Sequence, residues 1–253
     1  MAELLDFLKG WPPPTPGLAT HSCFMDDCPP PAGTTYQGSL GMNDPGYTSE
    51  STALLVVDPY NDFLSEGGKL WPRTKAVAEQ VGLLDHMRQV LAAARASRLR
   101  IMFVPHRRTS PGDYDTWAYL SPSQEATRKG QVFAAGRWGG EFHPDFQPRE
   151  GELRVHEHWS ASGFANTDLD FLLKQHHVSR IVLIGMRANT CIETTARFAQ
   201  ELGYHVTLIK DAIAAFRPEE MQATFELNAP TYAHAILTAE EFISGLPHGA
   251  TSP

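Results

Sequence analysis

The stretch IVLIGMRANTCIETTARFAQELGYHVTLI, residues 181–209, decides the fold class of this 253-residue chain. It begins and ends with the apolar runs IVLI (181–184) and VTLI (206–209), which are typical of strands buried on both faces of a parallel sheet. Between these runs, a predicted helix over 191–202 carries one apolar face, formed by Ile192, Ala196, Ala199 and Leu202. A strand, a helix and a second strand in this order predict the crossover unit of an α/β protein.

Strands and helices alternate over the rest of residues 51–247. Further apolar runs predict strands at 53–57, 101–104, 153–156 and 233–237. Amphipathic stretches predict helices at 75–97, at 167–177 with Thr167 as N-cap, at 218–227, and at the C-terminus with Thr238 as N-cap. We therefore expect one α/β domain with three layers (α/β/α), in which a mostly parallel sheet carries helices on both faces.

Residues 1–50 read as an arm, and residues 248–253 as a short tail. Between positions 11 and 50 the chain is rich in proline and glycine and has almost no apolar period, so we expect an extended segment that lies along the domain, crosses to another subunit or stays mobile. Cys23 and Cys28 lie on this arm in a C-x4-C spacing. A metal or redox pair is one interpretation, but no second pair of ligands follows, so incidental thiols are favoured.

The composition excludes several classes of partner. Lysine and arginine number 21 against 29 acidic residues, and the net charge of -8 offers no broad attraction to nucleic acid or to an anionic membrane surface. No apolar run approaches the roughly 20 residues of a membrane span, and the N-terminus lacks the order of a secretion signal. Three cysteines are too few for a disulfide framework. We expect a cytoplasmic protein that acts on a small molecule.

Cys191 lies at the start of the helix that follows strand 181–184. Thr190 and Glu193 fit a capping box, which predicts that Cys191 occupies the first helical position. There the helix dipole and unpaired N–H groups favour the thiolate, and ligands of open α/β sheets bind at this end of a strand. The hypothesis is a nucleophile; the alternative is a small buried cysteine that packs at the junction.

Asp58 directly follows the predicted strand 53–57 and therefore lies on the same edge of the sheet as Cys191. A carboxylate beside a cysteine can accept the thiol proton and return it to a leaving amine. The alternative is a turn former, because Asp-Pro sequences begin turns readily.

The sequence RVHEHWSASGFANTDLD, which begins at position 154, adds further polar candidates. His156 and His158 alternate on a presumed strand and would face the same way, so a metal pair with His106 or His143 is one interpretation. No H-E-x-x-H or C-x-x-C pattern accompanies it, which favours Glu157 or His158 as a polar wall of the pocket.

A long irregular segment, residues 107–151, combines glycines and prolines with the aromatic residues Trp117, Tyr119, Phe133, Trp138, Phe142 and Phe146. It predicts a lid or pocket wall, or else a satellite hydrophobic cluster that covers the sheet edge. No G-x-G-x-x-G, P-loop or G-x-S-x-G pattern is present, so dinucleotide, nucleotide and serine-hydrolase functions lose their usual support.

Three motifs give the chain a resemblance to the isochorismatase-like cysteine hydrolases, a superfamily that includes nicotinamidases, N-carbamoylsarcosine amidase, ureidoacrylate amidohydrolase and biuret hydrolase. They are VVDPYNDF (56–63), SGFANTDLD (162–170) and GMRANTCIETTARFAQELGYHVTLIKDA (185–212), within a match over about residues 50–245. The resemblance implies a homo-oligomer (dimer or tetramer) with an Asp-Lys-Cys triad, in which Asp58 and Cys191 match the aspartate and cysteine. It further implies an oxyanion hole made by the N–H groups of Arg187 and Cys191, behind a cis bond between Met186 and Arg187.

The chain departs from that pattern at the lysine. No lysine occurs between Lys129 and Lys174, and the matching positions hold Glu157 and His158. A cationic His158 would do part of the work of the lysine, whereas Glu157 would make the site more acidic. Tyr60 also stands where a glutamine is frequent.

The metal frame of the nicotinamidases is missing as well, because the segment after strand 101–104 offers only His106. We expect no metal and no cofactor, and nicotinamide is disfavoured as a substrate. The leading hypothesis is a cysteine hydrolase of C–N bonds in a small amide, ureide or carbamoyl compound, with an acyl-enzyme on Cys191 and Asp58 as acid and base. The candidate pocket residues are Tyr60, Asn61, His106, Trp117, Trp138, Trp159 and Phe164. The alternatives are a ligand-binding pseudoenzyme and a hydrolase of vinyl ethers or esters.

Overall fold

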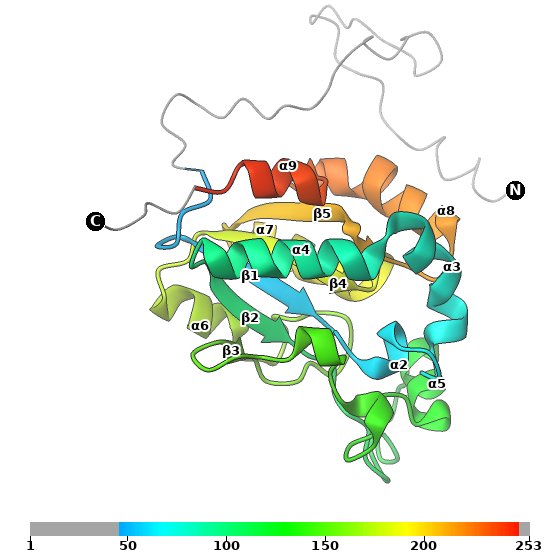
Figure 1. Cartoon of the computed structure of the whole chain (residues 1–253). Coiled ribbons are helices and arrows are strands. Elements are labelled where there is room, and N and C mark those ends of the chain that lie inside the picture. Colours follow the sequence, from blue (N-terminus) through cyan, green and yellow to red (C-terminus); the bar gives the residue numbers. More distant parts are fainter. Residues whose placement is uncertain (1–45, 248–253) are drawn as a thin grey trace, which may run out of the picture. The chain divides into compact units, whose positions relative to one another are not determined.

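The computed structural model describes residues 46–247, so residues 1–45 of the predicted arm, which include Cys23 and Cys28, and the predicted tail 248–253 lie outside the described residues. Within the described part, one sheet has six strands in the order β3-β2-β1-β4-β5-β6, and all neighbouring strands are parallel (Figure 1). The strands are β1 (Thr52–Val57), β2 (Arg100–Val104), β3 (Leu153–Arg154), β4 (Arg180–Met186), β5 (His205–Ala214) and β6 (Ala235–Leu237). The expected parallel α/β class is confirmed.

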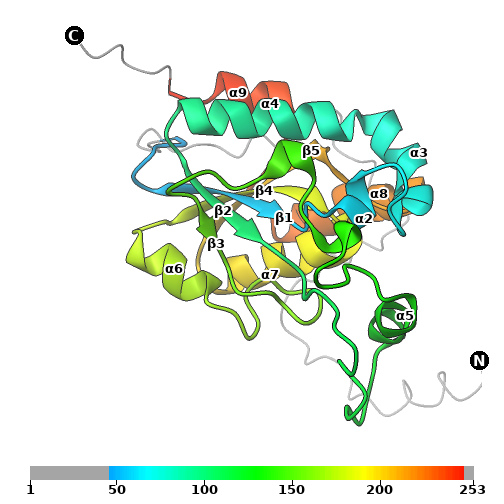
Figure 2. The same cartoon turned by 60° about the horizontal axis from the view of Figure 1, so that its bottom comes forward.

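The sheet is buried on both faces, as the apolar runs predict. Successive side chains of β1 alternate between faces, so Leu54 and Val56 join one hydrophobic cluster while Leu55 and Val57 join the other. The first cluster packs against α3 (Trp71–Val81), α4 (Leu83–Ala96) and α9 (Ala239–Ser244). The second packs against α6 (Leu169–Gln175) and α7 (Glu193–Glu201), and Figure 2 shows the two helix layers on opposite sides of the sheet.

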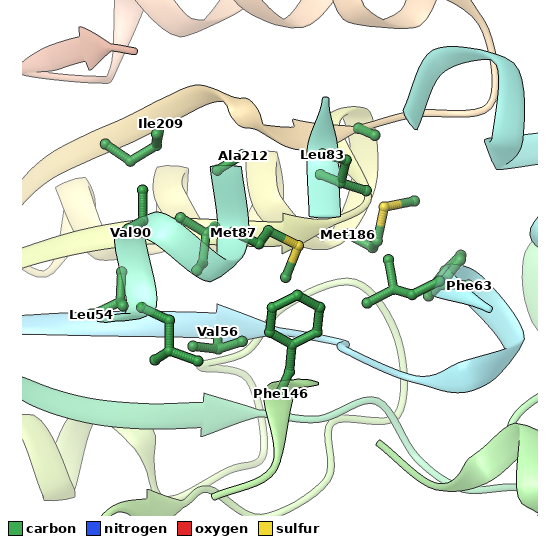
Figure 3. Close-up of a cluster of buried hydrophobic side chains, with 14 of the residues drawn as sticks. Leu54, Val56, Phe63, Leu83, Met87, Val90, Phe146, Met186, Ile209 and Ala212 are labelled. Atoms are coloured by element: carbon green, nitrogen blue, oxygen red, sulfur yellow. The ribbon is translucent and has the colours of Figure 1, made fainter. Parts of the chain in front are cut away.

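The close-up in Figure 3 shows the first of these clusters. Met87 and Val90 of α4 lie over Leu54 and Val56 of β1, and Phe146 from the irregular segment closes one side. All five side chains are fully buried. Such a core fixes the positions of the strand ends, which is where the polar candidates lie.

Several predicted elements differ from the observed ones. The helix expected over 75–97 is two helices, α3 and α4, because Gly82 between them adopts a left-handed conformation (φ 65°) that ends α3. The strand expected at 153–156 stops at Arg154. The helix expected at 218–227 is helical as α8 (Pro218–Gln222) and then widens into a π-helical turn.

The two predicted threonine caps have different outcomes. Thr238 forms a full capping box with Glu241 at the start of α9, as predicted. Helix α6 begins at Leu169 with Asp168 as its N-cap, so the predicted cap at Thr167 is wrong in position, although the Thr167 hydroxyl accepts the N–H of Leu169.

The irregular segment 107–151 contains α5 (Pro122–Gly130) and two short 3-10 turns. Its phenylalanines are buried: Phe133 stacks on Tyr60, which follows β1, and Phe142 stacks on Phe103 of β2. Tyr114 is buried as well, whereas Trp117, Tyr119 and Trp138 are exposed. The segment therefore covers the sheet edge as a hydrophobic cluster while it presents aromatic side chains to solvent.

The strand order reverses between β1 and β4. From β1 the chain builds outward through β2 and β3, and it then returns to the other side of β1 to build β4, β5 and β6. The carboxyl ends of β1 and β4 flank this switch point, the place where open α/β sheets bind their ligands. Helix α2 (Asn61–Leu64) follows β1 at this edge.

Among the helices of residues 46–247, none has the length and apolar character that a membrane span needs.

Candidate active site

Three buried side chains converge at the switch point: Asp58, His158 and Cys191. One oxygen, one nitrogen and the sulfur of this triad lie within 4.8 Å of one another, and the three residues are 0%, 0% and 7% exposed. Asp58 follows β1 and Cys191 follows β4. His158 pairs with His106 in an isolated parallel bridge beyond the ends of β3 and β2. The parallel topology thus brings three distant segments to one edge of the sheet.

The carboxylate of Asp58 is held at one oxygen and free at the other. Its Oδ1 accepts the backbone N–H of His106 at 2.6 Å and lies 3.2 Å from Nε2 of His158. Within residues 46–247, Oδ2 has no hydrogen-bond partner although it is buried. The Asp58 backbone is left-handed (φ 51°), a conformation that aspartate tolerates better than most residues. A buried carboxylate oxygen without a donor is available to take a proton.

The contacts of its two ring nitrogens indicate that His158 is a cation. Nδ1 donates to the carbonyl of Ser160, and Nε2 faces Oδ1 of Asp58. Both partners are acceptors, so both nitrogens carry protons. Burial alone would lower the pKa of His158, but the charge of Asp58 and the hydrogen bond to it outweigh burial and raise the pKa. The cation stays in the buried site as the counter-ion of Asp58.

The thiol of Cys191 is protonated at rest. Burial raises its pKa well above the ordinary value, and the charge of Asp58 raises it further. The hydroxyl of Thr190, 3.9 Å from Sγ, and the nearby N–H of Arg187 act in the opposite direction without reversing the shift. The expectation of a thiolate stabilised by a helix N-terminus is therefore wrong for the resting protein, and the thiol needs a base.

The predicted capping box at Thr190 and Glu193 is also wrong. Residues Ala188–Ile192 form a π-helical turn, and the carbonyl of Arg187 accepts the N–H groups of Thr190 and Ile192, each at 3.1 Å. The carboxylate of Glu193 instead binds Arg197 and Asn228. The wider turn leaves the Thr190 hydroxyl facing Cys191 rather than the helix backbone.

The backbone before this turn has two special features. The peptide bond between Met186 and Arg187 is cis, as the resemblance implied. Gly185 adopts φ 114°, and a Cβ at this position would collide with the carbonyl oxygen of Val57. Only glycine fits where β4 passes this close to β1, so the GMR sequence has a local physical reason.

Glu157, the other candidate for the position of the lysine, faces away from the triad. Its carboxylate accepts Nε of Arg108 at 2.6 Å and lies 3.6 and 3.8 Å from Arg107 and Arg154. The two side chains point in opposite directions: His158 is fully buried beside Asp58, whereas Glu157 is partly exposed and binds arginines. We call Glu157 with Arg107, Arg108 and Arg154 the outer ion cluster.

The predicted histidine metal pair is not formed. His156 is exposed and lies 3.5 Å from Asp168, whereas His158 is buried, because the strand ends at Arg154 and its alternation does not continue. His143 lies beside Asp145. The donors that do converge are the oxygen, nitrogen and sulfur of the triad, a set that suits a zinc ion.

Some of the predicted pocket residues hold neighbouring loops in place, and others lie beside the triad. The Tyr60 hydroxyl donates to the carbonyl of His106, and Asn61 donates to the carbonyl of Trp138 and accepts the hydroxyl of Ser65. Their polar groups are thus engaged in holding neighbouring loops. The ring of His106 lies 5.1 Å from that of His158, directly beside the triad.

The aromatic residues that were predicted to line the pocket lie in different parts of the structure. Trp117 and Trp159 contact each other and Tyr114, and Trp159 lines a cavity of about 200 Å³ together with residues 160–162, 165, 166 and 194. Trp138 is exposed, and Phe164 is buried against Phe198 beside the C-terminal half of α7. A larger cavity of about 830 Å³, between α4 and α9, contains no triad residue.

Sequence reasoning named Arg187 only for its backbone N–H and missed that its guanidinium lies with that of Arg73 on the ring of Phe216. The guanidinium carbons of Arg73 and Arg187 lie 4.0 and 3.9 Å from the ring centroid of Phe216. In the described part of the chain, no carboxylate lies within 4 Å of either guanidinium, and Arg187 donates only to the side chain of Asn189. Burial lowers the pKa of Arg187, while the charge of Glu220 acts in the opposite direction. We call Arg73, Phe216 and Arg187 the arginine rim.

Comparison with known proteins agrees with this architecture. Residues 52–240 match the isochorismatase domain. The ureidoacrylate amidohydrolase RutB of Pantoea ananatis is 27% identical over 207 residues, which are 78% of this chain and 82% of that protein. A cysteine hydrolase from Pseudomonas syringae pv. phaseolicola has a similar fold (TM-score 0.67, 24% identity, 81% of this chain and 98% of that one). N-carbamoylsarcosine amidase from Thermoplasma acidophilum aligns with a TM-score of 0.56 at 26% identity, over 75% of this chain and 97% of that one.

Proposed function

The chain belongs to the isochorismatase family of hydrolytic enzymes, and we propose that it cleaves a C–N bond of a small amide, ureide or carbamoyl compound through an acyl-enzyme on Cys191. The observation that carries this proposal is the convergence of a protonated thiol, an unpartnered carboxylate oxygen and an imidazolium in one buried cluster. A cytoplasmic location and a homo-oligomeric state stay predictions.

Acylation begins with proton transfer from Cys191 to Asp58. As Oδ2 of Asp58 takes the thiol proton, Sγ attacks the substrate carbonyl carbon, and the N–H of Arg187 stabilises the negative oxygen. The C–N bond then breaks, and Asp58 returns the proton to the leaving amine or ammonia. The products of this half-reaction are a thioester on Cys191 and a neutral amine.

Deacylation uses the same groups in reverse. A water attacks the thioester while Asp58 accepts one of its protons, and the proton returns to the departing sulfur. His158 does not exchange protons in this scheme; its charge balances that of the Asp58 carboxylate, and its hydrogen bond to Oδ1 holds that carboxylate in place while Oδ2 stays without a partner. This is the work that the resemblance assigns to the missing lysine.

The arginine rim favours a substrate with an anionic group. Within the described residues, the guanidinium groups of Arg73 and Arg187 share the ring of Phe216 without a carboxylate in contact, and Arg187 lies four residues before Cys191 in the turn that follows β4. A carboxylate would form charge-assisted hydrogen bonds there. The name of the Pantoea relative, a ureidoacrylate amidohydrolase, describes a substrate of this kind, an acid that carries a ureido group.

The test is a panel of amides, ureides and carbamoyl compounds, with ammonia or amine release as the measurement. We expect turnover by the wild type, a mass shift on Cys191 in rapidly quenched samples, and neither in Cys191→Ala. A Cys191→Ala variant with wild-type turnover would overturn the mechanism.

Substrate charge is tested with 3-ureidopropanoate and propylurea, which differ in a carboxylate and share the scissile group. We expect Arg187→Gln, which keeps the backbone N–H, to reduce kcat/KM for the charged substrate by about 10-fold or more, the equivalent of one charged hydrogen bond. The same variant should leave propylurea within about 2-fold. Equal losses for both substrates would contradict a role in charge recognition.

A further inference from the structure

We propose that the triad binds one Zn²⁺ ion reversibly and that the zinc-bound protein is catalytically inactive. The inference goes beyond the proposed hydrolase function, because it concerns binding of a metal to Asp58, His158 and Cys191 in the absence of any substrate. It depends on the histidine at position 158: a histidine supplies a ring nitrogen, whereas the lysine that the resemblance implies cannot ligate zinc as an ammonium ion.

The three donor atoms of the triad are of the types that zinc prefers. A carboxylate oxygen, an imidazole nitrogen and a thiol sulfur lie within 4.8 Å of one another. Three protein ligands of these types with one open position are typical of zinc. Calcium and magnesium prefer six or more oxygen ligands, so this site is selective against them.

The arrangement around these donor atoms also favours zinc binding. A tetrahedral zinc ion with bonds of about 2.0 to 2.3 Å needs its ligand atoms roughly 3.3 to 3.8 Å apart, and the Nε2–Oδ1 distance of 3.2 Å is close to this already. Nδ1 of His158 is fixed by the carbonyl of Ser160, the outer-shell partner that orients metal-binding histidines. Oδ2 of Asp58 is buried without a partner and is therefore free to ligate.

Charge balance favours zinc binding as well. At rest, the carboxylate of Asp58 and the imidazolium of His158 cancel, and the Cys191 thiol is neutral. Zinc binding displaces one proton from Nε2 and one from the thiol, so a double positive charge enters as two protons leave. The net charge of the buried cluster is zero before and after, which avoids the cost of an uncompensated buried charge.

The functional consequence is direct. Sulfur bound to zinc is no longer the free nucleophile, and the Asp58 carboxylate is engaged as a zinc ligand. Catalysis stops while zinc is bound and resumes when a chelator removes it.

The experiment measures zinc binding to the chelator-treated, substrate-free full chain by isothermal titration calorimetry. We expect one Zn²⁺ per chain, no binding of Mg²⁺, and at least about 100-fold weaker zinc binding in His158→Lys, which keeps the cation but removes the ligand. Cobalt provides a spectroscopic readout, because a thiolate-to-cobalt charge-transfer band should appear in the wild type and be absent in Cys191→Ser.

A matched control separates the triad from the arm. Cys23→Ser combined with Cys28→Ser should bind zinc with unchanged stoichiometry and affinity. Absence of a zinc ion in the wild type, equal affinity in His158→Lys, or loss of binding in the arm variant would each overturn the proposal. If His158→Lys does not fold, Asp58→Asn provides the same comparison. Since binding is measured without substrate, these results are independent of the test of the hydrolase.

Discussion

Two neighbouring residues, Glu157 and His158, belong to two ion clusters that differ in almost every physical respect. His158 faces inward to a single carboxylate, that of Asp58, and both side chains are completely buried. Glu157 faces outward to the three arginines of the outer ion cluster, and these side chains are partly exposed. Water screens the outer cluster, whereas the inner pair is fully buried beside the Cys191 thiol.

Burial, rather than ion-pair geometry, marks the chemical site. The Glu157–Arg108 contact of 2.6 Å is shorter than the His158–Asp58 contact of 3.2 Å. Burial nevertheless raises the pKa of the Cys191 thiol and isolates a carboxylate oxygen, and these two features occur only on the inner side within the described residues. The following predictions break one cluster at a time.

The largest effect is expected from the reacting pair itself. Cys191→Ala or Asp58→Asn should lower kcat by at least about 10⁴-fold, because one removes the nucleophile and the other the base, and such groups act as a unit. The double variant should be little worse than either single variant. Steady-state ammonia release measures this, with circular dichroism as the folding control. Multiplied effects in the double variant would show that the two residues act independently.

A smaller loss is expected when the inner cation is removed. His158→Gln should reduce kcat by about 10²- to 10³-fold and destabilise the protein by about 3 to 5 kcal/mol, because Asp58 becomes a buried charge without a counter-ion. His158→Lys should recover most of the activity, since it restores a cation at the same place. Urea unfolding and kcat measure the two effects. If lysine rescues no better than glutamine, His158 has a role other than its charge.

The distribution of correct and incorrect sequence predictions has physical reasons. The strands were predictable because IVLI and ALLVV are continuous apolar runs that suit only doubly buried strands, and parallel pairing then places Asp58 and Cys191 on one edge. Helix 75–97 was predicted as one element because its apolar spacing continues across Gly82, whereas the break depends on a single backbone angle.

The details of the site could be seen only in the folded structure. Glu157 and His158 lie in an irregular segment beyond the end of the strand, where side chains do not alternate regularly between the two faces of the sheet. The sequence pattern therefore does not tell which of the two faces inward. The capping-box pattern at Thr190 fitted an α-helical start, but the chain forms a π-helical turn there. The arginine rim joins residues 73, 187 and 216, and no local pattern links positions so far apart in the sequence.

The pH dependence separates the inner cation from the rest of the molecule. Because the folded pKa of His158 is raised, kcat/KM should fall as pH rises through that value, by up to 10-fold per pH unit on the basic limb. The stabilisation from the pair is complete below the unfolded pKa of about 6.5 and is lost as pH rises through the higher folded value. His158→Lys should move the limb to higher pH. Profiles are recorded with chelator present, and an unmoved limb would assign it to another group.

The smallest effect is expected from the outer cluster. Glu157→Gln should change kcat and KM by less than about 3-fold and lower the free energy of unfolding by about 1 kcal/mol, because its arginine contacts are partly exposed and screened. The basic limb of the pH profile should move slightly to lower pH, because the charge of Glu157 contributes to the raised pKa of His158. Raising the salt concentration should shrink the stability difference further but leave the His158→Gln defect nearly unchanged, because the buried pair is not screened. A Glu157→Gln variant as inactive as His158→Gln would mean that the arginines hold the catalytic edge in place, and the two clusters would then be one functional unit.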